Sequence, residues 1–341
     1  MQNIINAVER LMPESISVFK LRYKLLQKIL QKGLVGRRVL VQELELSERT
    51  VRAEIERLES QGLIDISSKG MSITIEGENV LSILYKVYHE MDELNTLEEQ
   101  IVAILGLKKA IVVKGDLVTD DIATNFGLAF RDLLEGLLTD NMTIAITGGS
   151  TVYQLVDNMP EIKHGLKALH ILPARGSVGK RVELQASTIA TMLADKLEAK
   201  YEMFTIPDNL SNQSIKLIKN EPEIEKLLQK LSKTDIIIFG IGSANKMAKK
   251  RKESEEILEL LDKGHAVAEA FRHYFDADGR VVYKSDVIGV SPEMAVNIPY
   301  RIAAASSAEK AEAILASKSL LKGSYLILDE SLAKALIEST N

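Results

Sequence analysis

Residues 143–152 read Thr-Ile-Ala-Ile-Thr-Gly-Gly-Ser-Thr-Val, an apolar run followed by two glycines and two hydroxyl side chains. The apolar run predicts a buried strand, and the residues from Ser150 onward predict the start of a helix. Glycine lets backbone amides approach an anion closely, and a helix N-terminus adds further amides and a partial positive charge. The stretch therefore predicts a strand, turn and helix that bind a phosphate group, with a plain connecting turn as the alternative.

The same turn disfavours two common nucleotide ligands. It lacks the glycine spacing of a dinucleotide-binding fingerprint, and it has no lysine at the position that a Walker motif requires. We therefore expect neither NAD nor ATP at this site.

Strands and helices alternate on both sides of this turn, from about Leu97 to the end of the chain. Continuous apolar runs of this length are typical of strands buried in a parallel sheet. Residues 275–283 interrupt the alternation with the pattern of an inserted β-hairpin. The pattern predicts an α/β, doubly wound domain at residues 96–341. The predicted strands are Ala110–Val113, Thr143–Thr147, Ala168–Pro173, Glu202–Ile206, Asp235–Gly240, Arg301–Ala305 and Tyr325–Leu328. The predicted helices lie around Asp121–Leu138, Val152–Asn158, Leu184–Ala199, Glu223–Leu231, Ser254–Leu261, Glu309–Ser317 and Glu330–Ile337.

Polar residues follow several of these strands, where an open α/β sheet binds its ligands. Each of them alone is more typical of an ordinary surface charge. Together they supply several cations and one hydrogen-bond acceptor, which suits a sugar that carries two phosphates. The candidates are Arg175, Gln185, Lys250, Arg251, Glu269 and Lys310.

Residues 39–58 have the pattern of a helix, a tight turn and a second helix. Ser47 is placed as the N-cap of the second helix, whose apolar face carries Val51, Ile55 and Leu58. Two alternating runs within residues 63–75, joined by a polar turn with glycine, predict a β-hairpin directly after it. This order predicts a winged helix-turn-helix DNA-binding domain at residues 1–76, with an ordinary helical hairpin as the alternative. The candidate DNA contacts are Arg37, Arg38, Ser47, Arg49, Thr50, Arg52 and Lys69.

Residues 77–95 predict one amphipathic helix between the two domains. Its apolar positions are spaced 4, 3, 4 and 3 residues apart, as in the seam of a coiled coil. The pattern lasts barely two heptads, so it predicts either a linker and oligomerisation helix or a helix that packs on its own domain. The positions are Val80, Leu84, Val87, Met91 and Leu94.

Composition sets outer limits on the function. The chain has 341 residues, a net charge of −5 and no cysteine, which excludes a disulfide framework, a thiolate zinc site and a cysteine nucleophile. Residues 1–76 carry 12 basic and 10 acidic side chains, so a small positive surface is possible on an acidic protein. The apolar runs are far shorter than the ~20 residues of a membrane helix, and Glu9, Arg10 and Glu14 interrupt any signal peptide. We expect a cytoplasmic protein without a membrane partner.

The sequence offers little for enzyme chemistry. The five histidines show no metal-ligand spacing, and the chain has no nucleophile elbow. Glu269, Asp276 and Asp278 remain as possible acids or bases, although the two aspartates are more simply explained by a turn. We therefore expect no catalysis, no metal site and no cofactor.

Five motifs together give the chain a resemblance that covers nearly its whole length. It resembles the sugar-responsive bacterial repressors of the sorbitol-operon (SorC) family, and within them the members that control a glycolytic operon. The motifs are Gly36-Arg37-Arg38, Thr147-Gly148-Gly149-Ser150-Thr151, Pro173-Ala174-Arg175-Gly176, Gly240-Ile241-Gly242, and Glu269-Ala270-Phe271 followed by Tyr274-Phe275.

The resemblance implies a winged helix-turn-helix domain joined to a non-catalytic effector domain that resembles sugar-phosphate isomerases. It implies a homo-oligomer, a dimer that forms a tetramer on double-stranded operator DNA, released by fructose-1,6-bisphosphate as the effector.

The resemblance also assigns roles in ligand binding. One phosphate is held by Gly149, Ser150, Thr151 and Val152, and Arg175 and Gln185 line the site. Lys250, Arg251 and Lys310 serve phosphate or sugar oxygens, and Glu269 accepts from sugar hydroxyls. Two positions differ from the family pattern: Lys250 replaces an arginine, and residues 306–309, Ser-Ser-Ala-Glu, replace a glycine-rich turn.

The alternative function is a sugar-phosphate isomerase or deaminase with an accessory N-terminal domain. The phosphate-binding turn fits such an enzyme. The missing catalytic base and the winged-helix order count against it.

Overall fold

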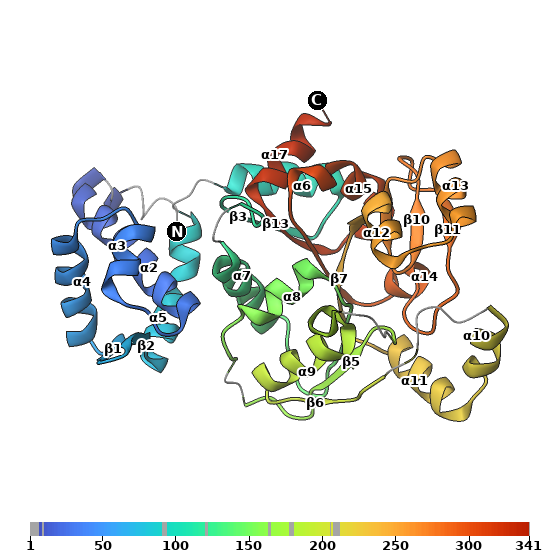
Figure 1. The fold of residues 1–341 in the computed structure, drawn as a ribbon, viewed down its shortest axis with the longest axis horizontal. Coiled ribbons are helices and arrows are strands. Elements are labelled where there is room, and N and C mark those ends of the chain that lie inside the picture. The colour runs from blue at the N-terminus through green and yellow to red at the C-terminus, as the bar shows by residue number, and fades with distance from the viewer. Residues whose placement is uncertain are drawn as a thin grey trace. The chain divides into compact units, whose positions relative to one another are not determined.

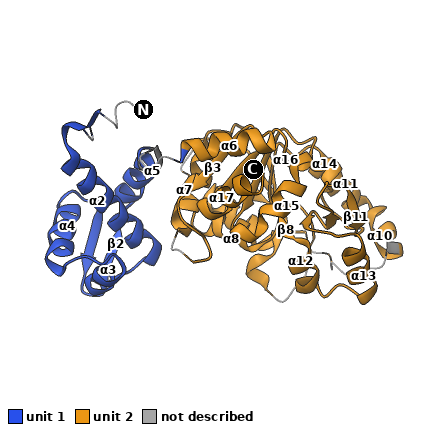
Figure 2. Cartoon of the chain, turned by 90° about the horizontal axis from the view of Figure 1, so that it is seen from above, with its two compact units in different colours: residues 1–94 blue, residues 95–341 orange. Residues whose placement is uncertain are grey.

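The computed structural model describes residues 7–340 except Glu9, 91–93, 120–121, 163–164, 177–180, Thr205 and 207–211. The chain forms two compact units, residues 1–94 and residues 95–341 (Figure 2). Residues 77–94, predicted as part of a linker helix or of a helix packed on its own domain, fall within the first unit.

The first unit is a helix-turn-helix followed by a two-stranded wing. Wing strands β1 and β2 pair antiparallel, and Val35 extends this small sheet through two backbone hydrogen bonds with Met71, of 3.0 and 2.8 Å. Tyr23, Leu40, Ile55 and Leu58 are fully buried between the helices, as the apolar spacing predicts. The elements are α2 (Pro13–Lys32), α3 (Arg37–Glu43), α4 (Glu48–Ser60), β1 (Ile64–Ser67), β2 (Gly70–Ile73) and α5 (Ile75–Glu90).

Helix α5 packs on α2 within the same unit. Its buried face carries Gly77, Leu81 and Tyr85, which are spaced four residues apart. A Cβ on Gly77 would lie 2.1 Å from the carbonyl oxygen of Leu63, so the helix approaches the wing closely at this point. The predicted seam is a neighbouring stripe on which Val80, Leu84 and Val87 are half-buried. Its last member, Leu94, is buried, and Met91 lies outside the described residues.

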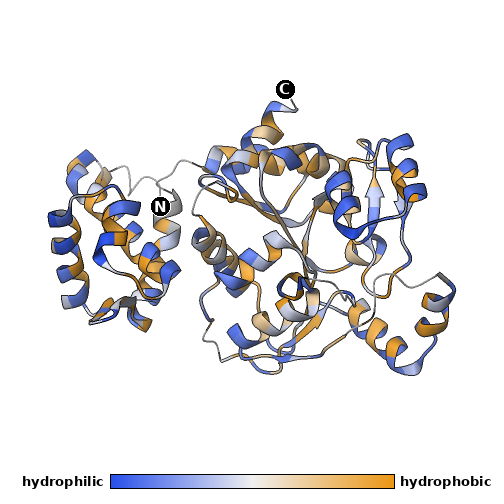
Figure 3. Cartoon of the chain, viewed as in Figure 1, coloured by the Kyte–Doolittle hydropathy of each residue, from blue (hydrophilic) through white to orange (hydrophobic). Residues whose placement is uncertain are grey.

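The second unit is built on a seven-stranded parallel sheet with the order β3-β13-β12-β7-β4-β5-β6 (Figure 1). Figure 3 shows its strands in hydrophobic colours, in agreement with the continuous apolar runs of the sequence. This architecture confirms the prediction of a doubly wound α/β domain. The strands are β3 (Lys109–Val113), β4 (Thr143–Ile146), β5 (His170–Pro173), β6 (Lys200–Tyr201), β7 (Ile236–Gly240), β12 (Tyr300–Ala305) and β13 (Tyr325–Asp329).

The chain reverses its direction of travel across the sheet between β4 and β7. From β4 it proceeds to β5 and β6, whereas from β7 it proceeds the other way to β12 and β13. Right-handed crossovers place the two sets of connecting helices on opposite faces. Helices α7, α8 and α9 contact one another in turn, and α17 contacts both α6 and α15. Open α/β sheets bind ligands at such a reversal, beyond the carboxyl ends of the strands.

The helices of the second unit agree with most of the predicted ones. They are α6 (Asn95–Leu105), α7 (Ala123–Glu135), α8 (Ser150–Asp157), α9 (Ala186–Lys196), α10 (Asn212–Lys219), α11 (Pro222–Ser232), α12 (Ala244–Arg251), α13 (Glu255–Lys263), α14 (Pro292–Ala295), α15 (Ala311–Ala316), α16 (Lys318–Leu321) and α17 (Glu330–Glu338), with short 3₁₀ turns η1 (Val182–Leu184) and η2 (Ala308–Lys310). No helix in the described part of the chain is long and apolar enough to cross a lipid bilayer.

An antiparallel sheet is inserted between β7 and β12, with the order β11-β10-β9-β8. The predicted hairpin at residues 275–283 is its β10–β11 pair. Its strands are β8 (Gly242–Ser243), β9 (Ala268–Ala270), β10 (His273–Phe275) and β11 (Val281–Lys284).

Local predictions differ from the structure at one strand and at several helices. The strand predicted at Glu202–Ile206 is replaced by the two-residue strand β6 at the sheet edge, because only Lys200 and Tyr201 pair with β5. Helices α6, α10, α12, α14 and α16 were not among the predicted helices. Helix α12 has no apolar stripe, since its buried residues are only Ala244 and Ala248 and the rest of it is largely basic.

Gly127 of α7 tests the packing that places α8. A Cβ at Gly127 would lie 2.1 Å from the backbone oxygen of Asn158, just after α8. We expect Gly127→Ala to lower the free energy of unfolding by about 2 kcal/mol, since overpacking against rigid atoms typically costs 1–3 kcal/mol. Urea denaturation measures this loss. Gly136→Ala is the matched control, because its nearest neighbour would be 3.6 Å away, and equal stability of the two variants would contradict the packing.

Candidate effector and DNA-binding sites

The turn after β4 is held from two sides. Thr147 donates its backbone N–H to Ile238 of β7 at 2.9 Å, and Gly149 donates to Leu184 of η1 at 3.0 Å. A Cβ on Gly148 would lie 2.5 Å from the Leu184 oxygen, so only glycine fits there. Gly149 has φ +135° and open space on its Cβ side, which leaves room for a ligand.

Helix α8 begins directly at this turn. Its first helical hydrogen bond runs from the Tyr153 N–H to the Gly149 oxygen at 2.9 Å. The amides of Ser150, Thr151 and Val152 precede that bond and have no helical acceptor, so they form the positive end of the helix dipole. This geometry suits an anion such as phosphate.

Lys310 lies beside the same turn, although it is far away in the sequence. Its Nζ is 3.4 Å from the Thr151 hydroxyl, which is 3.3 Å from the Ser306 hydroxyl. Burial lowers the pKa of Lys310, and the charges of Lys246 and Lys250 lower it further, against the opposing effect of Asp329. An anion bound here would relieve that repulsion.

The loop before Lys310 departs from a glycine-rich turn but adopts a similar backbone. Ser307 has φ +79°, a conformation that favours glycine. Its N–H donates to Oδ2 of the fully buried Asp329 at 2.9 Å, which stabilises this loop.

Arg251 and Glu269 form a buried ion pair after β7. Arg251 Nη1 lies 2.9 Å from Glu269 Oε1, with the two side chains 13% and 5% exposed. The Glu269 oxygen also accepts the backbone N–H of Arg272 at 2.8 Å. Burial raises the pKa of Glu269, but the charges of Arg251 and Arg175 outweigh it and hold the pKa below its ordinary value. Glu269 is therefore an ionised acceptor next to two guanidinium groups.

Further cations surround this pair. Partial burial lowers the pKa of Lys250, and the charges of Arg181 and Arg251 add to the effect. Arg181 and Lys246 were not among the predicted ligand residues, because neither lies in a recognisable motif. Arg181 is ion-paired with Glu183 at 2.8 Å, and Lys246 with Glu309.

Two remaining predicted residues lie at the same edge of the sheet. Half-buried Arg175 follows β5, where its backbone bridges to Gly289. Gln185 is the N-cap residue of α9, and its carbonyl carbon would lie 3.3 Å from a Cβ on Gly148. The structure thus places every predicted ligand residue at the carboxyl edge of the sheet, and their contacts with a ligand stay a prediction.

The helix-turn-helix exposes most of the predicted DNA contacts. Arg37 and Arg38 begin α3, Arg49 lies in the first turn of α4, and Lys69 is at the wing tip; all four are exposed. Part of the acidic charge of α4 is neutralised, since Glu54 is ion-paired with Arg22 of α2 at 2.6 Å.

Three predicted DNA contacts are engaged within α4 itself. Ser47 caps the helix by accepting the Thr50 N–H at 3.0 Å, and the two hydroxyls are 2.7 Å apart. Arg52 is exposed but ion-paired with Glu56 at 2.9 Å. Arg49, in the first turn of α4, is likewise exposed.

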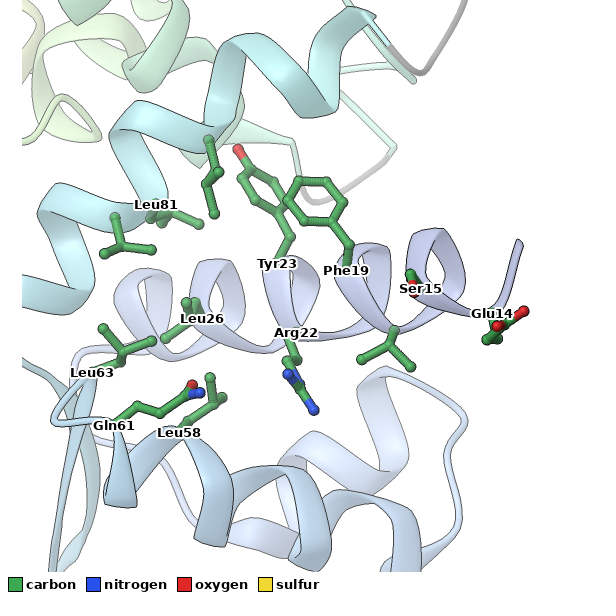
Figure 4. A pocket seen from close by; sticks show the side chains of 13 residues that line it. Glu14, Ser15, Phe19, Arg22, Tyr23, Leu26, Leu58, Gln61, Leu63 and Leu81 are labelled. Carbon is green, nitrogen blue, oxygen red and sulfur yellow. The ribbon is translucent and has the colours of Figure 1, made fainter. Parts of the chain in front are cut away.

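An apolar pocket of about 450 Å³ lies inside the first unit, between α2, α4 and α5 (Figure 4). The rings of Phe19 and Tyr23 lie side by side on its α2 wall, with centroids 6.1 Å apart. Its lining is too hydrophobic for a phosphorylated sugar. The lining residues are Glu14, Ser15, Val18, Phe19, Arg22, Tyr23, Leu26, Leu58, Gln61, Leu63, Val80, Leu81 and Leu84.

Among the described residues, no group of three or more His, Asp or Glu side chains is arranged to hold a metal ion. The side chains of His89 and His164 lie outside the described part.

Comparison with known proteins identifies both units. The family model "CggR N-terminal DNA binding domain" matches residues 18–88, and "Putative sugar-binding domain" matches residues 89–338. The central glycolytic genes regulator of Priestia megaterium is 36% identical over 344 residues, covering 100% of both chains. That of Bacillus subtilis is 34% identical over 339 residues, covering 99% of both. The chain belongs to the family of central glycolytic genes regulators.

Solved structures agree with this assignment. A crystal structure titled "putative SorC family transcriptional regulator" from Enterococcus faecalis has a TM-score of 0.67 and 33% identity, and covers 71% of this chain and 99% of that one. Full-length SorC from Klebsiella pneumoniae has the same fold, with a TM-score of 0.67 and 21% identity over 94% of this chain and 98% of that one. The chain is therefore a DNA-binding transcriptional regulator with a sugar-binding domain, and the isomerase or deaminase alternative is not supported.

Lys310 gives the anion site a characteristic pH dependence. The pKa of Lys310 is lowered from its ordinary value of 10.5, so its ammonium loses its proton at a lower pH than a free lysine. As the pH rises through that pKa, we expect the affinity for inorganic phosphate to fall roughly tenfold, because a charge-assisted hydrogen bond is lost. Bound phosphate restores the charge, so binding takes up a proton in that range. Calorimetry in two buffers of different ionisation enthalpy measures the uptake.

The control is Lys310→Arg, which stays charged and should bind phosphate without proton uptake. Lys249→Arg, which changes an exposed residue of α12, should show the same proton uptake as the wild type. Equal proton uptake in Lys310→Arg and wild type would rule out Lys310 as the group responsible.

Proposed function

We propose that this protein is a cytoplasmic repressor of a glycolytic operon, and that fructose-1,6-bisphosphate is its effector. The observation that carries the proposal is the pairing of two anion-binding clusters at the sheet reversal. One cluster is the α8 turn with Lys310, and the other is Arg175, Lys250 and Arg251 around the ionised Glu269. Two phosphates and a hydroxyl-bearing sugar between them match this arrangement.

In this proposal one phosphate binds the amides of Gly149, Ser150, Thr151 and Val152 and the ammonium of Lys310. The second phosphate binds Arg175 and Lys250. Glu269 accepts hydrogen bonds from sugar hydroxyls while Arg251 holds its carboxylate, and Gln185 lines the site. No catalytic residue and no cofactor take part.

The DNA-binding unit supplies the other half of the function. Arg49 and Thr50 at the start of α4 face the bases of the major groove, which is where a recognition helix reads sequence. Arg37, Arg38, Arg52 and Lys69 contact phosphates. Effector binding acts by differential affinity for two states of the protein, only one of which matches the operator half-sites.

Two variants with opposite expected effects distinguish effector binding from DNA binding. We expect Arg175→Ala to bind operator DNA normally and to lose its response to fructose-1,6-bisphosphate. Arg49→Ala should weaken operator binding about tenfold or more, as a lost base contact costs about 1–3 kcal/mol, while ligand binding stays intact. Fluorescence anisotropy on DNA from upstream of the protein's own operon, at two salt concentrations, measures both.

Arg57→Ala is the matched control for Arg49→Ala, because it removes the same charge from the exposed far end of α4. A normal sugar response of Arg175→Ala would show the site assignment to be wrong. Specific DNA binding that does not change when this sugar is added would support the repressor function and contradict the proposed effector.

The half-buried stripe of α5 supports a homo-oligomer. Val80 and Leu84 border the apolar pocket of the first unit, and a second copy that covers this stripe would bury both. A dimer also matches the two half-sites of a typical operator, and two dimers on DNA form the proposed tetramer.

Charge placed on this stripe tests the oligomer. Leu84→Glu should shift the sedimentation equilibrium toward smaller species, because a carboxylate in an apolar contact is strongly unfavourable. Ile83→Glu is the matched control, because Ile83 is the residue next to Leu84 and is 71% exposed. If both variants keep the association constant of the wild type, α5 is not the contact.

A further inference from the structure

The turn between β9 and β10 has an unusual backbone for its sequence. Its central residues, Phe271 and Arg272, have φ +51° and +65°, a conformation that glycine and asparagine favour in two-residue hairpins. Neither residue is of that kind, so the turn needs outside support. The turn directly follows Glu269, the predicted sugar-hydroxyl acceptor.

Contacts on both residues hold this turn. The Phe271 ring packs on Phe239 of β7, with centroids 5.0 Å apart. The Arg272 N–H donates to Glu269 Oε1 at 2.8 Å, and its guanidinium is ion-paired with Glu253 at 2.8 Å. The side chains of Glu253 and Arg272 are each only 9% exposed.

Tyr274 joins this second ion pair to the first. Its hydroxyl donates to Glu253 Oε1 at 3.2 Å and accepts from Arg251 Nη1 at 3.4 Å. Arg251 in turn holds Glu269 Oε1 at 2.9 Å. The contacts thus run from Glu269 through Arg251, Tyr274 and Glu253 to Arg272, and return to Glu269 through the Arg272 amide.

Burying these charged side chains costs free energy of hydration that an apolar core would not lose. Two buried ion pairs lose hydration, and apolar residues of similar size often serve a core equally well. Burial raises the pKa of Tyr274 to about 12, so its hydroxyl keeps its proton and stays a donor at neutral pH. Both contacts on Glu269 fall on Oε1, which leaves Oε2, among the described residues, as the acceptor for a ligand.

We infer that Glu253, Arg272 and Tyr274 are positioning residues that orient Glu269 and Arg251 toward the hydroxyl groups of a sugar phosphate. The inference rests on the proposed function for the class of ligand. The positioning residues act on the hydroxyl-binding part of the site and leave the α8 turn, which binds phosphate, unaffected. They therefore set the preference for a sugar phosphate over inorganic phosphate.

Tyr274→Phe tests the inference with the smallest change of shape. Tyr283→Phe is the matched control, because Tyr283 lies on neighbouring β11 with its ring 6.1 Å from that of Tyr274, and no described contact joins it to the ion pairs. Full-length wild type and both variants are compared by calorimetry with fructose-1,6-bisphosphate, fructose-6-phosphate and inorganic phosphate. We expect Tyr274→Phe to lose at least fivefold in affinity for the sugars and less than twofold for phosphate.

A second measurement needs no ligand. The Nε–Hε NMR signal of Arg251, assigned with Arg251→Lys, should shift and exchange faster with water in Tyr274→Phe and in Glu253→Gln, but not in Tyr283→Phe. These changes would support the positioning role even if no sugar in the set bound the wild type, a result that would refute only the proposed effector. An unchanged Arg251 signal, or an equal loss of affinity for sugar and phosphate, would overturn the inference.

Discussion

The carboxylate of Asp329 is the interaction on which the ligand-binding edge of the second unit depends. It is fully buried at the end of β13 and accepts four hydrogen bonds. Oδ1 accepts from the Leu332 N–H at 3.0 Å and the Ser331 hydroxyl at 3.2 Å, which caps α17. Oδ2 accepts from Leu117 at 3.1 Å and Ser307 at 2.9 Å. One side chain thus connects the loops after β3 and β12 to α17, and the second of these loops places Lys310 beside the turn before α8.

The same edge gathers more positive charge than its own acidic groups neutralise. Lys246 and Lys250 lie close enough to Lys310 to lower its pKa, and Arg181 and Arg251 act in the same way on Lys250. The unliganded site therefore contains electrostatic repulsion that an anion removes. In the proposed function, a ligand with two phosphates relieves it at both clusters, and a conformational switch requires in addition that the ligand bind the two states of the protein with different affinity.

Sequence patterns predicted the parts of this structure that depend on local chemistry. Continuous apolar runs identified the parallel strands, and the two glycines at 148 and 149 identified the turn before α8. The missed helix α12 has no apolar stripe, because only two alanines are buried on it. The roles of Asp329, Arg272 and Tyr274 depend on partners that the fold brings together, such as Leu117, which lies 212 residues before Asp329. No spacing in the sequence reports such contacts.

Phosphate recognition and sugar recognition have different consequences for specificity. In the proposed site, the amides of α8 and the lysines attract any phosphorylated metabolite, because they interact with charge and do not distinguish stereochemistry. A buried carboxylate such as Glu269 discriminates far more strongly, since a ligand without a hydroxyl at the matching position leaves it unpaired. That discrimination requires a carboxylate with one orientation, and the contacts of Arg251 and the Arg272 amide on Oε1 provide it. In the proposed site, affinity thus comes from the cations, while selectivity comes from a single acidic residue and the ion pairs that hold it.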